Sequence, residues 1–236
     1  MSSHKLRFIL VVFTFIPVWA LAQYRDAGLW SSVSASAQVS KKFQINLAAE
    51  IRLSENLSQL SRAFSEVGVE YKLRKWLDGS LTYRGGTANN QSSYDYRQRL
   101  QFGLAAKKKF DDFALSLQTR WQLGINGPNS DSDSDFYTTL RNKFQFKYTG
   151  LKNLDLATSY EIFNNTGAYQ SLILQNWRWV ISAEKKINKK NYLSVGYMIQ
   201  KGLLDSPQEL DFIILVNYKI EFDLRKKDKN PEESTK

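Results

Sequence analysis

The sequence predicts an all-β protein, an antiparallel up-and-down transmembrane β-barrel of about 10–12 strands. Three features favour this fold. Apolar and polar residues alternate one by one through most of the chain, and the alternating segments mostly run 11 to 15 residues. The connections between segments are alternately short and long, and no stretch has helical periodicity.

The segment 43–55, FQINLAAEIRLSE, gives the clearest alternation. Its odd positions are all apolar up to Leu53, and its even positions are polar except for Ala48. Successive side chains on a strand point to opposite faces. The segment is therefore predicted to be a strand with one apolar face and one charged face.

The same pattern predicts ten further strands along the chain. The eleven alternating segments, in order, are 29–39, 43–55, 62–72, 77–84, 95–104, 113–123, 136–148, 154–162, 173–184, 193–200 and 211–222. An odd number puts the two termini at opposite ends of a barrel, whereas bacterial single-chain barrels have even numbers. Either one strand is miscounted, or the first segment closes the barrel irregularly.

The connections alternate in kind as well as in length. Short turns rich in Lys, Asn or Asp follow the odd segments, at 40–42, 74–76, 108–112, 149–153 and 188–191. Longer polar loops follow the even segments, at 55–61, 87–93, 126–135, 164–167 and 204–209. Short turns at one end and long loops at the other are typical of outer-membrane barrels, with the turns facing the periplasm.

Segment length and aromatic placement indicate which face is inside. A tilted membrane-spanning strand needs about 9–11 residues, whereas soluble strands typically run about 5–6. Tyr and Trp, which prefer the headgroup level, collect near segment ends on the apolar face, as Tyr71, Tyr96, Trp121 and Trp177 do. In lipid only closure satisfies every backbone group. The apolar face is therefore expected to contact lipid and the charged face to line the lumen.

The charged face supplies a candidate site within the bore. We expect opposite charges to form a ladder there, comprising Glu50, Arg52, Glu66, Glu70, Arg97, Arg99, Arg120, Arg141, Lys143 and Arg178. Barrels of eight strands are filled by side chains, and open channels appear at 16–18 strands. A packed or very narrow lumen is thus predicted.

The chain ends bear signals of export and solvation. A basic start (His4, Lys5, Arg7), an apolar run over 8–20 and the small residues around position 22 predict a cleaved signal peptide over 1–22. The barrel is expected over 23–225, followed by a polar C-terminal tail over 226–236. The chain has no cysteine and a net charge of +10, and an exported protein is not expected to bind nucleic acid.

Histidine usage argues against an enzyme. His4 is the only histidine and leaves with the signal peptide, so no imidazole remains as a general base. Glu66 and Glu70 are the nearest candidates for a paired-carboxylate site, but pairing with arginine in the lumen is favoured. The run Asp131–Asp135 starts like a calcium loop, yet the sixth and twelfth places hold Phe136 and Asn142. No catalytic residue, metal or cofactor is expected.

Several segments carry a family resemblance. They are GLW at 28–30, KKF and EIRLSEN within 41–56, QLSRAFSEVGVEYKL at 59–73, LTYRGG at 81–86, YDYRQRLQF at 94–102 and LRNKFQFKY at 140–148. With these the chain resembles a family of bacterial outer-membrane β-barrels known only as a domain of unknown function. The resemblance covers nearly the whole mature chain. It implies a barrel in the outer membrane and brings no catalytic residue or ligand with it.

The sequence indicates a general class of function. We expect an integral β-barrel of the Gram-negative cell outer membrane, porin-like, acting as a narrow polar conduit selected by lumen arginines or as a structural barrel. The expected partners are outer-membrane lipid and lipopolysaccharide, and the barrel-assembly machinery during insertion. The alternatives are a surface interaction module using loops 55–61 and 126–135, and a soluble periplasmic lipid-binding barrel with the apolar face inside.

Overall fold

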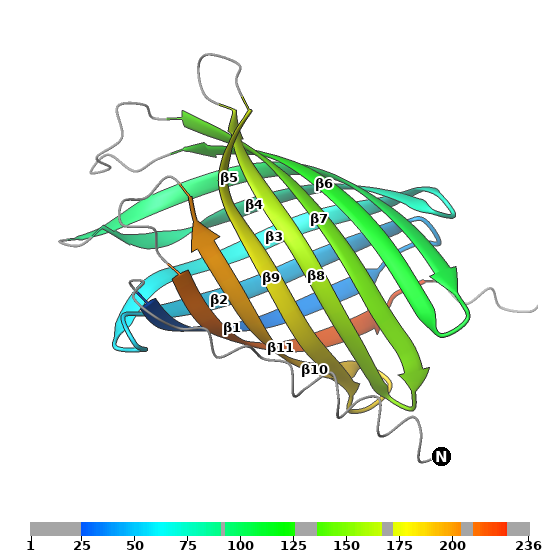
Figure 1. Ribbon diagram of the computed structural model, residues 1–236. Helices are drawn as coiled ribbons and strands as arrows, with labels where there is room; N and C mark the ends of the chain where they lie inside the picture. Colours follow the sequence, from blue (N-terminus) through cyan, green and yellow to red (C-terminus); the bar gives the residue numbers. More distant parts are fainter. Residues whose placement is uncertain (1–24, 91–92, 126–135, 167–171, 204–209, 226–236) are drawn as a thin grey trace, which may run out of the picture.

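Eleven β-strands form one closed barrel in the computed structural model, which describes residues 25–90, 93–125, 136–166, 172–203 and 210–225 (Figure 1). The strands are β1 (Arg25–Gln38), β2 (Phe43–Ser54), β3 (Gln59–Arg74), β4 (Leu77–Asn90), β5 (Ser93–Phe110), β6 (Phe113–Ile125), β7 (Phe136–Leu151), β8 (Leu154–Thr166), β9 (Leu172–Lys186), β10 (Asn191–Gly202) and β11 (Leu210–Asp223). The prediction of an all-β, mostly antiparallel barrel of about 10–12 strands is confirmed. Within the described residues, no helix is long and apolar enough to cross a membrane.

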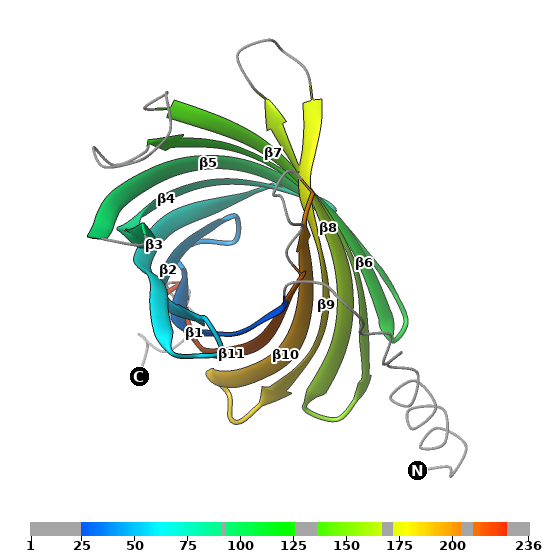
Figure 2. The same ribbon diagram turned by 60° about the vertical axis from the view of Figure 1, so that its left-hand side comes forward.

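The barrel closes between β1 and β11, which pair in parallel. Every other neighbouring pair is antiparallel, and the strands form a closed ring (Figure 2). The parallel register runs from Arg25↔Leu210 to Gln38↔Asp223, so it covers the full length of both strands. Strands joined in sequence by hairpins alternate in direction, so the first and eleventh must run the same way. The count of eleven therefore holds, and closure is the irregular feature.

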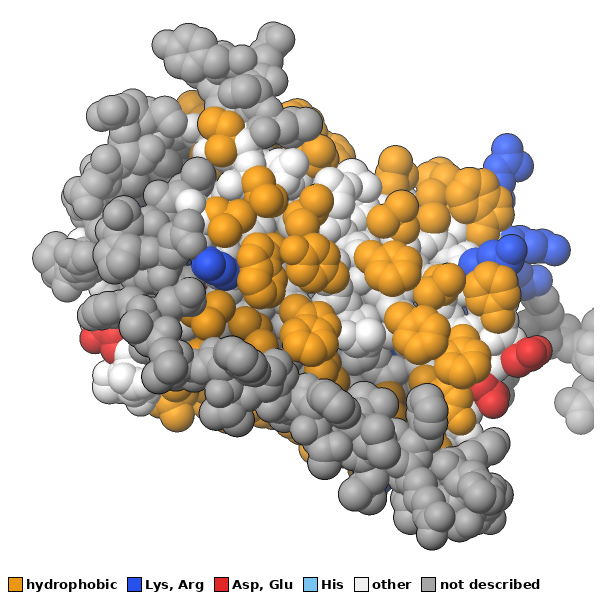
Figure 3. Space-filling view, viewed as in Figure 1, with side chains coloured by type: hydrophobic (Ala, Val, Ile, Leu, Met, Phe, Trp, Pro, Cys, Tyr) orange, Lys and Arg blue, Asp and Glu red, His pale blue; other side chains and the backbone are white. Residues whose placement is uncertain are grey.

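The apolar face of each strand points outward. Leu47, Phe102 and Leu104 are 53%, 45% and 53% exposed, whereas the charged Arg141 and Glu161 are 8% and 7% exposed. Figure 3 shows hydrophobic side chains spread over the visible wall, with Lys and Arg gathered mainly at the end that carries the short turns. The alternative of a barrel with its apolar face inside is wrong.

The strands extend further than the alternation predicts. Residues 87–90 belong to β4, 108–110 to β5, 149–151 to β7 and 164–166 to β8, although each range was assigned to a connection. Two-residue turns therefore connect β5 to β6 and β7 to β8. Asp111 and Asn153 take positive φ angles of 45° and 59° there, which short polar side chains tolerate.

The loop between β2 and β3 has an unusual backbone. Glu55, Asn56 and Leu57 are consecutive and all have positive φ, of 50°, 55° and 71°. The Asp26 carboxylate of β1 accepts hydrogen bonds from the backbone N–H of Glu55 at 3.0 Å and of Asn56 at 2.8 Å. Left-handed conformation is costly for residues with a Cβ. A carboxylate on the neighbouring strand thus holds the loop in a strained conformation.

Some sequence-based expectations lie outside the described residues. These are the signal peptide over 1–22, the tail over 226–236, the acidic run Asp131–Asp135 and the loop 204–209. Among the residues that the structure describes, no group of three or more metal-ligating acidic, His or Cys side chains occurs.

Candidate functional site: the arginine-lined bore

Three of the aromatic side chains that point into the bore stack on arginines. Trp30 lies on β1, Phe64 on β3 and Phe163 on β8. Trp30 is paired with the inward-facing Arg52, and Phe163 with the inward-facing Arg141. A guanidinium group stacks favourably on an aromatic face. The inward rings therefore provide stacking surfaces for the lumen arginines.

Arg52 and Arg84 occupy two of these faces. The Cζ atom of Arg52 lies 3.4 Å from the Trp30 ring centroid and 4.9 Å from that of Phe64. The Cζ atom of Arg84 lies 3.6 Å from the Phe64 centroid. Arg52 Nε also donates a hydrogen bond to Glu50 Oε1 at 2.6 Å. Stacking and ion pairing together fix the Arg52 guanidinium in place.

Arg178 and Arg141 continue the stacking on the other side of the bore. Arg178 Cζ lies 4.4 Å from the Phe163 centroid and 5.0 Å from that of Trp30, and Arg141 Cζ lies 4.4 Å from Phe163. In the sheet, β9 and β1 are separated by β10 and β11, so the Arg178–Trp30 contact spans the interior. We call this set the arginine–aromatic belt: Arg84, Phe64, Arg52, Trp30, Arg178, Phe163 and Arg141, in order of contact.

Two carboxylates hold the arginines at the ends of the belt. Glu161 accepts two hydrogen bonds from Arg141, from Nε at 3.1 Å and from Nη2 at 2.9 Å, and one from Arg120 Nη2 at 3.4 Å. Glu66 accepts a hydrogen bond from Arg84 Nε at 2.5 Å and lies 3.7 Å from Arg99 Nη2. Each carboxylate therefore pairs with two arginines.

Arginines also oppose one another directly across neighbouring strands. The cross-strand pairs of like charge are Arg52↔Arg62, Arg84↔Arg99 and Arg120↔Arg141. Like charges directly opposite each other destabilise a sheet. Three such pairs in one bore concentrate positive charge beyond what Glu66 and Glu161 neutralise.

Several guanidinium atoms in the bore have no hydrogen-bond acceptor. Arg97 Nε, Arg99 Nη2 and Arg120 Nε are buried without a hydrogen-bond partner. Arg62 is exposed to solvent, and neither it nor Arg97 forms an ion pair with another residue that the structure describes. Buried donors without acceptors are costly. The bore therefore offers unused donors to a solute.

Charge is distributed unevenly along the bore. In the half near the loops, the described strands present nine inward cations, namely Arg52, Arg62, Arg84, Arg97, Arg99, Arg120, Arg141, Lys143 and Arg178. The same half presents six inward carboxylates, namely Asp26, Glu50, Glu66, Asp95, Glu161 and Asp211. The loop-side half thus carries an excess of positive charge.

The half near the short turns is balanced and more open. Lys147 Nζ lies 2.6 Å from Asp155 Oδ2 and 3.4 Å from Glu184 Oε1, beside a cavity of about 350 Å³. Lys219 lies 2.9 Å from Glu221 and 3.6 Å from Glu184. Lysines there pair with carboxylates, so this half supplies no excess of either sign.

The structure brings most of the predicted ladder together. All ten residues lie on the inward face of their strands, at both levels of the bore. Glu70 lies 3.9 Å from Lys107 near the turns and apart from Glu66, so the two glutamates form no pair. Arg178 donates a hydrogen bond to the side-chain oxygen of Gln200.

Sequence reasoning missed the aromatic half of the belt. Trp30 and Phe64 occupy even positions in segments whose even positions otherwise face the lumen, so their parity alone would have placed them inside. Phe163 occupies an odd position, like the inward Glu161, so parity places it inside as well, and the register shift of β8 begins only after it. Arg62 and Arg84 also face the bore, but the predicted ladder did not include them.

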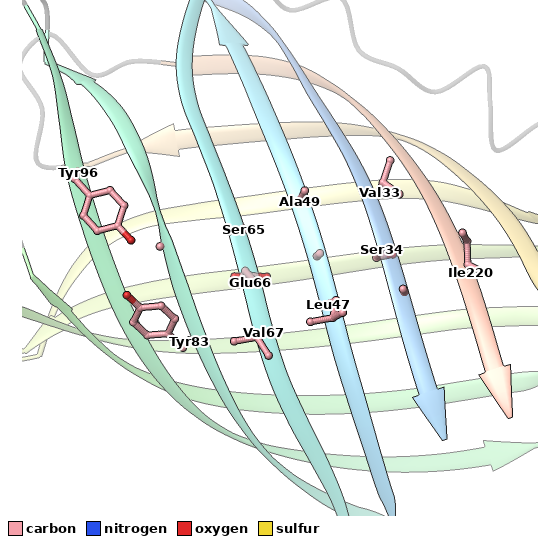
Figure 4. A pocket seen from close by; sticks show the side chains of 13 residues that line it. Val33, Ser34, Leu47, Ala49, Ser65, Glu66, Val67, Tyr83, Tyr96 and Ile220 are labelled. Atoms are coloured by element: carbon pink, nitrogen blue, oxygen red, sulfur yellow. The ribbon is translucent and has the colours of Figure 1, made fainter. Parts of the chain in front are cut away.

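A hollow of about 510 Å³ lies in the outer wall over β1 to β5 (Figure 4). Small residues, including Ala35, Ala49 and Gly85, line part of this hollow. The hydroxyl groups of Tyr83 and Tyr96 point toward each other at its edge in Figure 4. The hollow lies in the wall and not in the bore.

The fold and the bore define a closed β-barrel with an arginine-rich interior and an apolar exterior. The chain belongs to the family described as "Protein of unknown function (DUF2490)", which matches residues 27–210. Comparison with the curated proteins finds no match. One similar solved structure is the anion-selective porin from Comamonas acidovorans, with 11% identity and a TM-score of 0.37. The match covers 72% of this chain and 48% of the porin, so the chain spans about half the porin's length.

Proposed function

We propose that the protein is an integral outer-membrane barrel whose bore is a narrow, arginine-lined conduit that favours small anions and excludes large solutes. The long loops face the exterior and the short turns face the periplasm. The observation that carries the anion preference is the set of three directly opposed arginine pairs in one half of the bore.

The outer wall supports a membrane location. The strands run from 12 to 18 residues, longer than the roughly 9–11 that a tilted strand needs to cross the hydrocarbon core. Large apolar side chains such as Leu117 (54% exposed) and Val195 (48% exposed) project from the wall. Exposing so much apolar surface to water is unfavourable, whereas hydrocarbon accommodates it.

Packing at the belt supports a narrow path. Arg52, Arg141 and Phe163 are only 8%, 8% and 6% exposed, and Met198 of β10 is 2% exposed although it faces inward. Side chains that water scarcely reaches leave no room for a sugar. Rings of arginine or lysine select anions in pores, because they attract anions and repel cations.

Planar-bilayer recording under a KCl gradient tests the proposal. We expect small conductance steps and a reversal potential that indicates chloride preference. Arg99→Ala and Arg141→Ala should each shift the reversal potential toward cations, after heat-modifiable migration on gels has verified folding. Lys72→Gln, which removes an inward charge from the turn-side end of β3, is the matched control and should cause no shift.

Two results overturn the conduit. One is cation preference in the wild-type barrel. The other is zero conductance that stays at zero in Arg99→Ala and Arg141→Ala, which would leave a structural barrel. Liposomes that contain the protein should also exclude a trisaccharide, and rapid sugar uptake would contradict the narrow path.

A further inference from the structure

We infer that the loop-side end of the bore contains a discrete binding site for a doubly charged tetrahedral oxyanion, of the phosphate or sulfate class, formed by Arg62, Arg84, Arg97 and Arg99. We call these four residues the mouth arginine site. The inference deepens the proposed function and rests on it, because the site lies in the same bore.

The register of β3, β4 and β5 brings the four arginines to one place. Arg84 of β4 is directly opposite Arg99 of β5. Arg62 of β3 pairs with Ala88, and Arg97 of β5 pairs with Gly86. The β4 positions between Arg62 and Arg97 thus carry at most a methyl group. Gly86 itself is covered by Ala63 and Phe64 of β3, so the guanidinium groups of Arg62 and Arg97, and not the β4 backbone, would contact a ligand.

Tyr137 of β7 bounds the same space. Its ring lies over Gly124 so closely that a Cβ at that position would overlap it. Gly124 is directly opposite Arg99, so the absence of a side chain lets the phenol reach toward β5. A phenol hydroxyl there can donate to an oxyanion.

The donors of the site are available to a ligand. Arg97 Nε and Arg99 Nη2 are buried without a hydrogen-bond acceptor, and Arg62 is exposed within the mouth. The nearby inward carboxylates are Glu66, which is bound to Arg84, and Asp95, two residues from Arg97. Glu50, also near Arg62, is already neutralised by its ion pair with Arg52. Four guanidinium groups against two carboxylates leave two positive charges. That excess matches a dianion better than chloride.

Guanidinium groups bind tetrahedral oxyanions through paired, charge-assisted hydrogen bonds. Chloride offers no such paired geometry, so the site should discriminate by shape as well as by charge. The arginine–aromatic belt, which shares Arg84 with the site and narrows the bore beyond the mouth, would hold the anion at this level.

Isothermal titration of the refolded full-length chain tests the site. Inorganic phosphate is titrated into protein in phosphatidylcholine vesicles without lipopolysaccharide, with chloride at equal ionic strength as the reference. We expect saturable binding of one phosphate per barrel. Arg62→Gln and Arg97→Gln should each weaken it at least about tenfold, because each removes a charge-assisted hydrogen bond. Lys72→Gln, on the same strand as Arg62, should leave it unchanged.

The inference is overturned if the heat of phosphate binding does not saturate, or if it equals the heat measured with chloride. It is also overturned if Lys72→Gln weakens phosphate binding as much as Arg62→Gln does. A second arm of the experiment adds purified lipid A. If lipid A displaces the bound phosphate, the site binds a lipid phosphate group, and the assignment to a free oxyanion is overturned. Equilibrium binding does not need ions to cross the bore. Saturable binding with zero conductance would therefore refute the conduit alone, and anion conductance without saturable binding would refute the site alone.

Discussion

Replacing Glu161 with glutamine should destabilise the barrel strongly. Glu161 is 7% exposed and accepts two hydrogen bonds from Arg141 and one from Arg120, which face each other across β6 and β7. The neutral amide leaves two opposed, poorly hydrated arginines without a counter-charge. Removing one partner of a buried ion pair costs about 3–5 kcal/mol, so we expect Glu161→Gln to lower the free energy of unfolding by about that amount.

Urea unfolding of the barrel in lipid vesicles, followed by tryptophan fluorescence, measures this change. The matched control is Glu221→Gln, because the Glu221 side chain is 43% exposed and pairs with Lys219 at 2.9 Å. An exposed pair contributes about 0–1 kcal/mol, so the control should change little. Equal effects of the two substitutions, or no effect of Glu161→Gln, would refute the assignment of Glu161 as the counter-charge of the bore.

Three further substitutions probe other parts of the molecule. Trp30→Ala removes the ring on which Arg52 and Arg178 stack, so the single-channel conductance should rise. An unchanged conductance would show that the arginine–aromatic belt is not the narrowest part of the bore. Leu57→Gly should raise the free energy of unfolding by about 1–2 kcal/mol, because Leu57 has a φ of 71° and glycine has no Cβ to strain there. The control Leu57→Ala keeps the Cβ. If it raised the free energy of unfolding equally, backbone strain would be excluded as the cause. Leu104→Arg, on the outer wall near mid-strand, should lower the free energy of unfolding in vesicles by about 2–4 kcal/mol. Ser116→Arg, which faces the bore, should lower it less. The reverse order would contradict the outward orientation of the apolar face.

Alternation alone predicted the strands and their two faces. The clean parity of 43–53 fixes which side chains of β2 face outward, since one face must be apolar wherever hydrocarbon or a core covers it. The extra strand residues at 87–90 and 108–110 were missed because Asn, Lys and Thr there read as turn residues. Backbone pairing with the neighbouring strand continues through them regardless of side-chain type.

The partners within the bore could not be predicted in the same way. A ladder of opposite charges was expected, yet Arg84 is directly opposite Arg99 and Arg120 is directly opposite Arg141. Parity fixes the face of a side chain, but cross-strand register decides its neighbour, and register depends on turn geometry. The two-residue turn at 111–112 sets the β5–β6 register, and thereby which residues face Arg120. Charge patterns along one strand do not contain that information.

The inward orientation of the polar face is tested most directly by spin labels, because the chain contains no cysteine that would need to be removed. Single cysteines at Val33, Ser34, Ala35 and Ser36 of β1 would carry the label in protein reconstituted into vesicles. We expect labels at Val33 and Ala35 to relax with oxygen, which partitions into hydrocarbon. Labels at Ser34 and Ser36 should relax with a water-soluble nickel chelate. Equal nickel accessibility at all four positions, or the opposite alternation, would contradict the inward orientation of the polar face.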